Sequence, residues 1–263
     1  MADSIDTRLR ERLDPPDGVV PEDIDGVLDC IGGPKVPPSA SQRLMEAPFY
    51  ALGYEAVFRP ALTRLVTRQT VEGAMRLSSR LMCLESDDVV LDVGCGTGNF
   101  TRTLARSVGR TTGLVVGLDL SAPMLARGEA LRRQDELPQV RFVRGDATRL
   151  PFVDDAFDAV HTAGALHLMP DVDGVLAELA RVVRPGGRLV IGTFVLSRDR
   201  RLRRAERAVR PLIGFRFFDD DDLRARIEAA GFDVLDRVVD GLAITLGAER
   251  RADRIAHHRR ART

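Results

Sequence analysis

The stretch VLDVGCGTGNFTRTLA, residues 90–105, decides how the rest of the chain can be interpreted. An apolar run leads into three glycines at alternating positions, Gly94, Gly96 and Gly98, and Asp92 lies two residues before the first of them. The pattern predicts a buried strand, a tight turn and the beginning of a helix. Glycines at such a turn allow a backbone to approach a ligand closely, so the stretch raises the question of which ligand that is.

The glycine spacing narrows the ligand classes. A P-loop ends in Gly-Lys-Ser or Gly-Lys-Thr, whereas Asn99 and Phe100 follow Gly98 here, which excludes a phosphate-cradling P-loop. A dinucleotide fingerprint has the form G-x-G-x-x-G or G-x-G-x-x-A, so Asn99 also weakens that alternative. Asp119 ends the next apolar run, where a carboxylate can accept the ribose hydroxyls of an adenosine. The residues alone favour an adenosine ligand and do not separate NAD from other adenosine ligands.

The composition is that of a globular protein. The chain has 263 residues, enough for one α/β domain with additions, and 44% of them are hydrophobic. No run approaches the roughly 18 apolar residues of a membrane span, and the polar, acidic N-terminus lacks the apolar core of a signal peptide. The cysteines Cys30, Cys83 and Cys95 have no C-x-x-C spacing, which argues against a disulfide framework and a zinc site. We expect a cytoplasmic protein without a metal.

Short apolar runs and amphipathic segments alternate after residue 86. The runs indicate strands at 88–94, 113–120, 140–146, 157–164 and 186–195, and the amphipathic segments indicate helices at 98–108, 121–134, 172–183 and 219–231. Strands that are apolar throughout predict a parallel sheet covered on both faces. Two closing runs, 232–239 and 242–249, flank Asp240-Gly241, a hairpin signal that predicts an antiparallel last strand. The predicted fold class is α/β, a doubly wound, mostly parallel, seven-stranded sheet.

The chain divides into several predicted parts. Residues 1–40 are rich in Asp, Pro and Gly and are expected to be a loosely ordered segment with a short helix near 6–13. Residues 41–85 show helical periodicity and predict a helical N-terminal cap. The remaining parts are the sheet domain at 86–248, a lid or insertion within it at 196–220, and a basic C-terminal tail at 249–263.

Four segments together resemble the successive motifs of a known family. They are VLDVGCGTGNF, LDLSAPML, GDATRLPF with FDAVHTAGALHLMPD, and RVVRPGGRLVIGTF. In this order and spacing they are similar to class I S-adenosylmethionine-dependent methyltransferases, and most of all to the small-molecule enzymes of menaquinone and ubiquinone biosynthesis. The resemblance covers about residues 86–247 and implies a Rossmann-like methyltransferase fold with S-adenosylmethionine as the cofactor.

The resemblance also implies roles for individual residues. Asp92 would hold the methionine ammonium group, Asp119 would bind the ribose diol, and Leu120 and Met124 would flank the adenine. Further cofactor positions are Gly94, Cys95, Gly96 and Gly98 in the loop, Asp146 and Ala147 at the adenine edge, and Ala163 and Gly164 near the sulfonium. For Leu120, Met124 and Ala147, an ordinary place in the core is the alternative.

Histidines and tyrosines supply the predicted catalytic and substrate residues. His167 follows the strand 157–164 at the mouth of the predicted site, and it is the predicted catalytic residue because some methyl acceptors must lose a proton. The alternative is that His167 stabilises its loop. His161 lies within that strand and is expected to be a core histidine. Tyr50 and Tyr54 share an aromatic helix face and could contact substrate, although packing of the cap on the sheet is the favoured interpretation.

The predicted function is methyl transfer to O, C or N of a small or lipid-like metabolite, with no nucleic-acid partner. The segment TAGALH lacks the Asn-Pro-Pro-Tyr or Asp-Pro-Pro-Tyr sequence typical of enzymes that methylate amino groups in DNA or protein glutamine. The arginine-rich segments leave open weak membrane-surface contact through a helix at 198–213 and an RNA-directed methyltransferase. A non-catalytic S-adenosylmethionine-binding protein is a further alternative.

Overall fold

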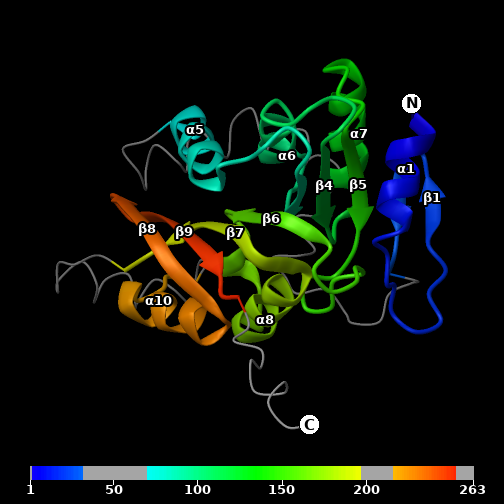
Figure 1. Cartoon of the computed structure of the whole chain (residues 1–263). Coiled ribbons are helices and arrows are strands. Elements are labelled where there is room, and N and C mark those ends of the chain that lie inside the picture. The colour runs from blue at the N-terminus through cyan, green and yellow to red at the C-terminus, as the bar shows by residue number, and fades with distance from the viewer. Residues whose placement is uncertain (1, 32–69, 197–215, 253–263) are drawn as a thin grey trace, which may run out of the picture.

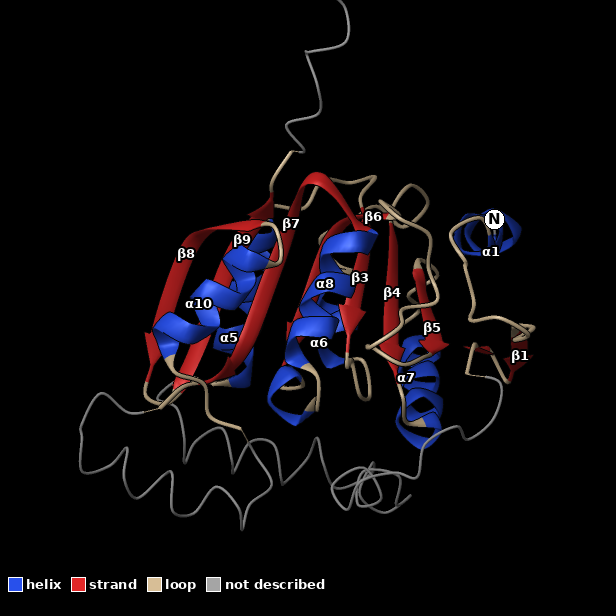
Figure 2. Cartoon of the chain, turned by 90° about the horizontal axis from the view of Figure 1, so that it is seen from below, coloured by secondary structure: helices blue, strands red, loops and turns tan. Residues whose placement is uncertain are grey.

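The computed structural model describes residues 2–31, 70–196 and 216–252. Its elements form a nine-stranded sheet with helices on both faces (Figures 1 and 2). Across the sheet the strands are β1 (Glu22–Ile24), β2 (Val27–Asp29), β5 (Val140–Arg144), β4 (Leu114–Asp119), β3 (Val89–Val93), β6 (Phe157–Ala163), β7 (Val183–Phe194), β9 (Ala243–Arg250) and β8 (Phe232–Asp240).

The six strands from β2 to β7 across the sheet are parallel, and the outer pairs are antiparallel. The chain builds the sheet outward from β3 through β4 to β5 and then returns to the other side of β3 with β6. The strand order therefore reverses between β3 and β6. In open α/β sheets, ligands bind beyond the carboxyl ends of the strands at such a reversal.

Helices cover the two faces of the sheet in separate groups. Helices α5 (Val71–Met82), α6 (Asn99–Leu104) and α7 (Ala122–Gln134) lie on one face, at the top of Figure 1. Helices α1 (Ala2–Arg10), α8 (Val172–Val182) and α10 (Asp220–Ala229) contribute to the core on the other face, and the short helix η2 (Leu166–Leu168) follows β6. No helix in the described parts of the chain is long and apolar enough to cross a membrane.

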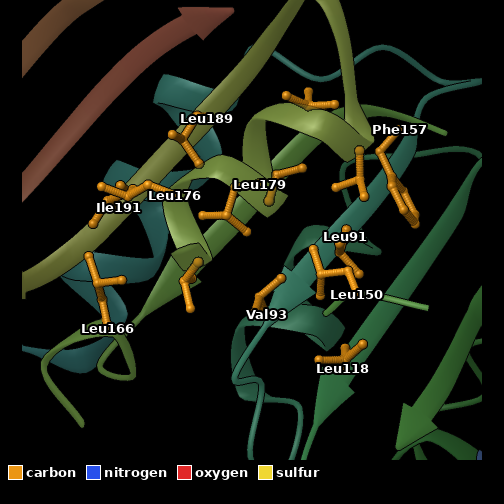
Figure 3. Close-up of a cluster of buried hydrophobic side chains, with 14 of the residues drawn as sticks. Leu91, Val93, Leu118, Leu150, Phe157, Leu166, Leu176, Leu179, Leu189 and Ile191 are labelled. Atoms are coloured by element: carbon orange, nitrogen blue, oxygen red, sulfur yellow. The ribbon is translucent and has the colours of Figure 1, made fainter. Parts of the chain in front are cut away.

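The central strands are mostly apolar because both faces are covered. All five residues of β3 are buried: Leu91 and Val93 belong to the core on the α8 face, and Val90 belongs to the core on the α6 face. Figure 3 shows Leu91, Val93 and Leu118 facing the leucines of α8. Burying a leucine side chain contributes roughly 2 kcal/mol, so these strands fix the sheet that positions the loops above it.

The predicted fold class is confirmed, with two strands more than expected. The mostly parallel sheet, the helices between its strands and the antiparallel end are present. The Asp240-Gly241 pair joins β8 to β9, and Gly241 has a φ of 61°. The additional strands, β1 and β2, come from the N-terminal segment.

The prediction of a loosely ordered segment at 1–40 is wrong for residues 2–31. Helix α1 buries Ile5 and Leu9 in the core, and Leu13 pairs with Phe152 in an isolated bridge. Residues 145–156, all of them described, form no helix between β5 and β6, so α1 covers that part of the sheet. Strands β1 and β2 have three residues each, which is too short for a periodic pattern to be recognised in the sequence.

Several predicted parts lie wholly or partly outside the described residues. Of the predicted cap at 41–85, the structure describes residues 70–85, which include α5. The positions Tyr50 and Tyr54 and the arginine-rich segment 198–213 lie outside. Most of the predicted tail, from residue 253 onward, lies outside as well.

Candidate functional site

The glycine loop lies at the carboxyl end of β3, where the strand order reverses. The amides of Gly94 and Cys95 donate to the carbonyl of Leu118 at 2.8 and 3.0 Å, and the amide of Gly98 donates to the carbonyl of Cys95 at 2.9 Å. These bonds fold the loop against the end of β4. The φ angles of Gly94, Gly96 and Gly98 are 69°, 57° and 78°, the left-handed region in which side chains other than glycine are strained.

The three glycines serve different purposes. A Cβ on Gly94 would lie 2.3 Å from the Cβ of Ala165, and a Cβ on Gly98 would lie 2.6 Å from the Cζ of Phe142, so both positions are required by protein packing. A Cβ on Gly96 would have no atom within 4 Å among the described residues. The same is true of Gly164, which has a φ of 73°: a Cβ there would have no described atom within 4 Å. Gly96 and Gly164 are therefore the places where a ligand can approach the backbone.

Asp119 connects the glycine loop to the helix that follows β4. Its Oδ2 accepts a hydrogen bond from the amide of Gly96 at 2.8 Å, and its Oδ1 accepts one from the amide of Ser121 at 2.9 Å. Burial raises the pKa of this carboxyl, while the two amides act in the opposite direction. Each carboxylate oxygen can accept more than one hydrogen bond, so Asp119 retains capacity for the hydroxyls of a ribose.

Asp92 lies beneath the loop and is 2% exposed. The hydroxyl of Thr101 donates to its Oδ2 at 2.6 Å, and its Oδ1 lies 2.7 Å from the Nδ1 of His161. Both carboxylate oxygens thus have protein partners. The predicted contact between Asp92 and the methionine ammonium group stays a prediction.

Cys95 contributes its main chain to the loop, and its side chain points below it. A Cβ on Gly117 would lie 3.0 Å from the Sγ of Cys95, which places the sulfur against β4. Burial raises the pKa of this thiol well above its usual range, and the nearby carboxylates of Asp119 and Asp92 act in the same direction. The thiol is therefore protonated at neutral pH and has the character of a small apolar group.

The predicted adenine edge is formed at the ends of β4 and β5. Met124 is 4% exposed, Leu120 is half-buried, and Ala147 packs against the core. The exposed Asp146 accepts hydrogen bonds at its Oδ1 from the amide and the hydroxyl of Thr148, both at 2.8 Å. Its Oδ1 thus folds its own loop, and the predicted role of Asp146 and Ala147 at the adenine edge stays a prediction.

Two residues that the sequence did not single out support this edge. Arg144, the last residue of β5, donates through Nε to the carbonyl of Leu120 at 3.1 Å. Its Nη1 donates to the Oδ2 of Asp29 in β2 at 2.8 Å. No sequence pattern connects Asp29 to Arg144, because the parallel pairing of β2 with β5 that brings them together is a long-range contact.

The end of β6 leads to the predicted catalytic residue. Ala163 ends the strand, and the amide of Gly164 donates to the carbonyl of Gly192 at 2.9 Å. His167 is 5% exposed, and its ring lies edge-on to Phe194 with 4.8 Å between centroids. Burial lowers the pKa of His167 to about 4. The imidazole is therefore neutral at neutral pH.

His161 is buried completely, as expected for a core histidine, but its partners are polar. Its Nδ1 faces Asp92, its Nε2 lies 3.2 Å from the hydroxyl of Ser78 in α5, and its ring lies 4.7 Å from that of Phe100. Sequence reasoning missed Ser78 and Thr101 because single hydroxyl residues on helices give no signal. Among the described residues, no group of His, Cys, Asp and Glu could hold a metal ion.

The site fits the cofactor that the sequence resemblance implies. The open space at Gly96 and Gly164 gives an extended ligand two close approaches to the backbone. Asp119 lies at the end of β4, where a ribose diol would bind. The helix α6 begins at the loop, so its first amides can favour a carboxylate.

Comparisons with known proteins agree with this geometry. Residues 90–187 match the protein family described as "Methyltransferase domain". A curated demethylmenaquinone methyltransferase of Bacillus cereus is 42% identical over 111 residues, which are 42% of this chain and 46% of the relative. The chain therefore spans about half the length of this curated relative.

Solved structures share the fold at lower identity. An S-adenosylmethionine-dependent methyltransferase of Aquifex aeolicus is 20% identical with a TM-score of 0.59, over 78% of this chain and 98% of the other. The [4+2]-cyclase SpnF is 22% identical with a TM-score of 0.65, over 84% of this chain and 99% of the other. The family match supports S-adenosylmethionine as the cofactor. Residues 90–187 thus match a methyltransferase domain family, and the chain resembles class I S-adenosylmethionine-dependent methyltransferases, including those of menaquinone biosynthesis.

Proposed function

We propose that this protein binds S-adenosylmethionine and transfers its methyl group to a small quinone-like or lipid-like metabolite. The observation that carries the proposal is the loop at Gly96, which leaves its backbone open while its amide is held by Asp119. A glycine turn that only joins a strand to a helix would need no half-buried carboxylate to hold its central amide. The family match over residues 90–187 supports the same reading.

In this proposal, the residues of the chain bind and orient the cofactor. Gly94, Cys95, Gly96 and Gly98 offer main-chain atoms to the methionine portion, and Asp119 accepts the ribose hydroxyls. The adenine side is formed by Leu120, Met124, Asp146 and Ala147. The chain passes near the sulfonium group of the cofactor at Ala163 and Gly164. The cofactor supplies an electrophilic methyl group, and the protein contributes alignment of the acceptor and exclusion of water.

His167 is the proposed catalytic residue of this site. Its ring is neutral at neutral pH, so it can accept a proton or a hydrogen bond from the acceptor. A pKa of about 4 makes the buried ring a weak base, which favours acceptors that are already acidic or need only orientation. An acidic acceptor that becomes negatively charged beside the ring would raise the pKa of His167 and strengthen it as a base.

The names of the curated relatives support the proposed substrate class. The Bacillus cereus and Oceanobacillus iheyensis proteins are named demethylmenaquinone methyltransferases, and the second is 34% identical over 130 residues. The substrate in these names is a quinone that lacks a methyl group, which supports a quinone-like acceptor. We propose a quinone-like ring as the acceptor for this chain, with O or N acceptors as the alternatives.

The test is a methyl-transfer assay with labelled S-adenosylmethionine. The purified protein is incubated with demethylmenaquinone and, separately, with metabolite extracts, and labelled products are separated by chromatography. We expect label in a quinone-like product and binding of S-adenosylmethionine by calorimetry. Binding without transfer to any acceptor would overturn the enzyme proposal in favour of a non-catalytic binding protein, and transfer only to RNA would overturn the substrate class.

A further inference from the structure

A row of buried polar side chains connects helix α5 to the glycine loop. The hydroxyl of Ser78 lies 3.2 Å from the Nε2 of His161, whose Nδ1 lies 2.7 Å from Asp92. The hydroxyl of Thr101 completes the row with its bond of 2.6 Å to the other oxygen of Asp92. Each of the four residues is at most 2% exposed. They come from α5, β6, β3 and α6, so the row crosses four elements.

The chemistry of Asp92 fixes the direction of its hydrogen bond with His161. A carboxylate only accepts hydrogen bonds, so the Nδ1 of His161 carries a proton and donates it to Asp92. The other ring nitrogen, Nε2, shares a hydrogen bond with the hydroxyl of Ser78. A buried carboxylate that loses one of its donors is strongly destabilised, so the row holds its members in one arrangement.

Asp92 holds the glycine loop at both ends. It lies two residues before Gly94, and its partner Thr101 lies in the first turn of α6, which begins after Gly98. Phe100, from the same turn, packs against the ring of His161 at 4.7 Å. A loop with three left-handed glycines has much conformational freedom of its own, so its geometry depends on such anchors.

The other end of the row is Ser78, which lies in α5, so the bond to His161 depends on the position of this helix. This helix precedes the methyltransferase domain and is the described part of the predicted cap. Beside the row, α5 contacts α6 through the Sδ of Met75, which lies 3.5 Å from the hydroxyl of Thr103, and its residues Leu77 and Leu81 belong to the core on this face of the sheet. The bond between Ser78 and His161 is the polar contact through which α5 reaches the buried carboxylate under the loop.

We propose that His161 is a positioning residue that couples the seating of α5 to the geometry of the cofactor loop. Cofactor affinity then depends on Ser78, although Ser78 does not touch the loop. The coupling is reciprocal, so cofactor binding stabilises the seated position of α5. The inference rests on the proposed function, since it takes S-adenosylmethionine as the ligand of the loop.

The test compares two neighbouring serines on α5. Ser78→Ala removes the bond to His161, and Ser79→Ala removes a buried hydroxyl that has no partner among the described residues. Hydrogen exchange of residues 94–104 is measured in the protein without cofactor, and the affinity for S-adenosylhomocysteine is measured by calorimetry. We expect Ser78→Ala to speed exchange in the loop and to weaken binding about 3- to 10-fold, and Ser79→Ala to change neither.

A third variant separates positioning from general stability. His161→Asn keeps a donor near the place of Nδ1 and cannot reach Ser78, so it should behave like Ser78→Ala. Adding Ser78→Ala to His161→Asn should then weaken binding no further. Equal effects of the two serine variants, or additive effects in the double variant, would overturn the coupling.

Failure of the proposed function is seen separately. A wild-type protein that does not bind S-adenosylhomocysteine or S-adenosylmethionine contradicts the proposed function. The hydrogen-exchange comparison needs no ligand and decides the coupling in either case.

Discussion

The two halves of the proposed cofactor pocket are built differently. On the methionine side, Asp92 is buried and bound by Thr101 and His161. On the adenosine side, Asp119 is half-buried, and Asp146 is exposed and bonded only within its own loop in the described structure. One side is thus a closed network beneath the backbone, and the other is a set of groups that solvent or a ligand can reach.

The methionine side and the adenosine side also differ in which segments of the chain supply their contacts. Asp92 and Thr101 are nine residues apart, whereas the contact between Arg144 and Asp29 on the adenosine side joins residues 115 apart. The methionine side thus combines this short-range bond with the contact of Asp92 to His161, which lies 69 residues away in β6, while the adenosine side depends on the N-terminal segment. We expect substitutions on the methionine side to affect folding and binding together, and those on the adenosine side to affect mainly binding.

The largest expected effect is that of Gly94→Ala. The new Cβ would lie 2.3 Å from the Cβ of Ala165, and the φ of 69° adds backbone strain. We expect the free energy of unfolding to fall by about 3 kcal/mol, from strain and overpacking together. The control is Gly18→Ala, where φ is 76° and no described atom lies within 4 Å, which isolates strain at about 1 kcal/mol. Denaturant unfolding measures both, and equal losses would show that the contact with Ala165 is not rigid.

The second prediction concerns the pH dependence of stability. The pKa of His167 is about 4 in the folded protein and near 6.5 when unfolded, so between these values the unfolded chain binds the extra proton. Stability from this group is present above pH 6.5 and is lost as the pH falls toward 4, by up to about 3 kcal/mol.

The control for this prediction is a variant without the titrating ring. His167→Asn should lose less stability than the wild type over the same pH range, because neither state takes up that proton. Unfolding curves at several pH values measure the difference. Parallel pH profiles of the two proteins would contradict the buried, neutral state of His167.

The third prediction compares two carboxylates on the adenosine side. Asp119→Asn replaces an acceptor of the Gly96 and Ser121 amides and of the proposed ribose hydroxyls. We expect about 10- to 100-fold weaker binding of S-adenosylhomocysteine, since hydrogen bonds to charged groups contribute about 1.5–3 kcal/mol. Asp146→Asn, at the exposed carboxylate, should weaken binding much less. Similar losses of affinity in both variants would mean that Asp146 contributes as much to cofactor binding as Asp119, which contradicts this prediction.

The smallest expected effect tests the support from the N-terminal segment. Asp29→Asn and Arg144→Lys each weaken the contact that holds the carbonyl of Leu120. We expect about fivefold weaker cofactor binding, corresponding to roughly 1 kcal/mol for one hydrogen bond. Arg149→Lys is the control, because Arg149 is exposed and lies 3.8 Å from the exposed Asp17. Unchanged cofactor affinity in the first two variants would show that the N-terminal segment does not contribute to binding through this contact.

The sequence by itself determined the central sheet and the loop. Strands buried on both faces are mostly apolar, so β3, β4 and β6 could be recognised from short windows. The alternating glycines and the acids at Asp92 and Asp119 marked the loop, because a backbone that must turn and approach a ligand restricts residue choice locally.

Only the tertiary structure decided how these residues are used. It separated Gly94 and Gly98, which are needed for contacts with Ala165 and Phe142, from Gly96, which faces open space. It also added two strands at 22–29, connected His161 to Asp92 and connected Asp29 to Arg144. Such contacts join positions far apart in the chain. They follow from strand register and helix packing, which no local pattern of residues records.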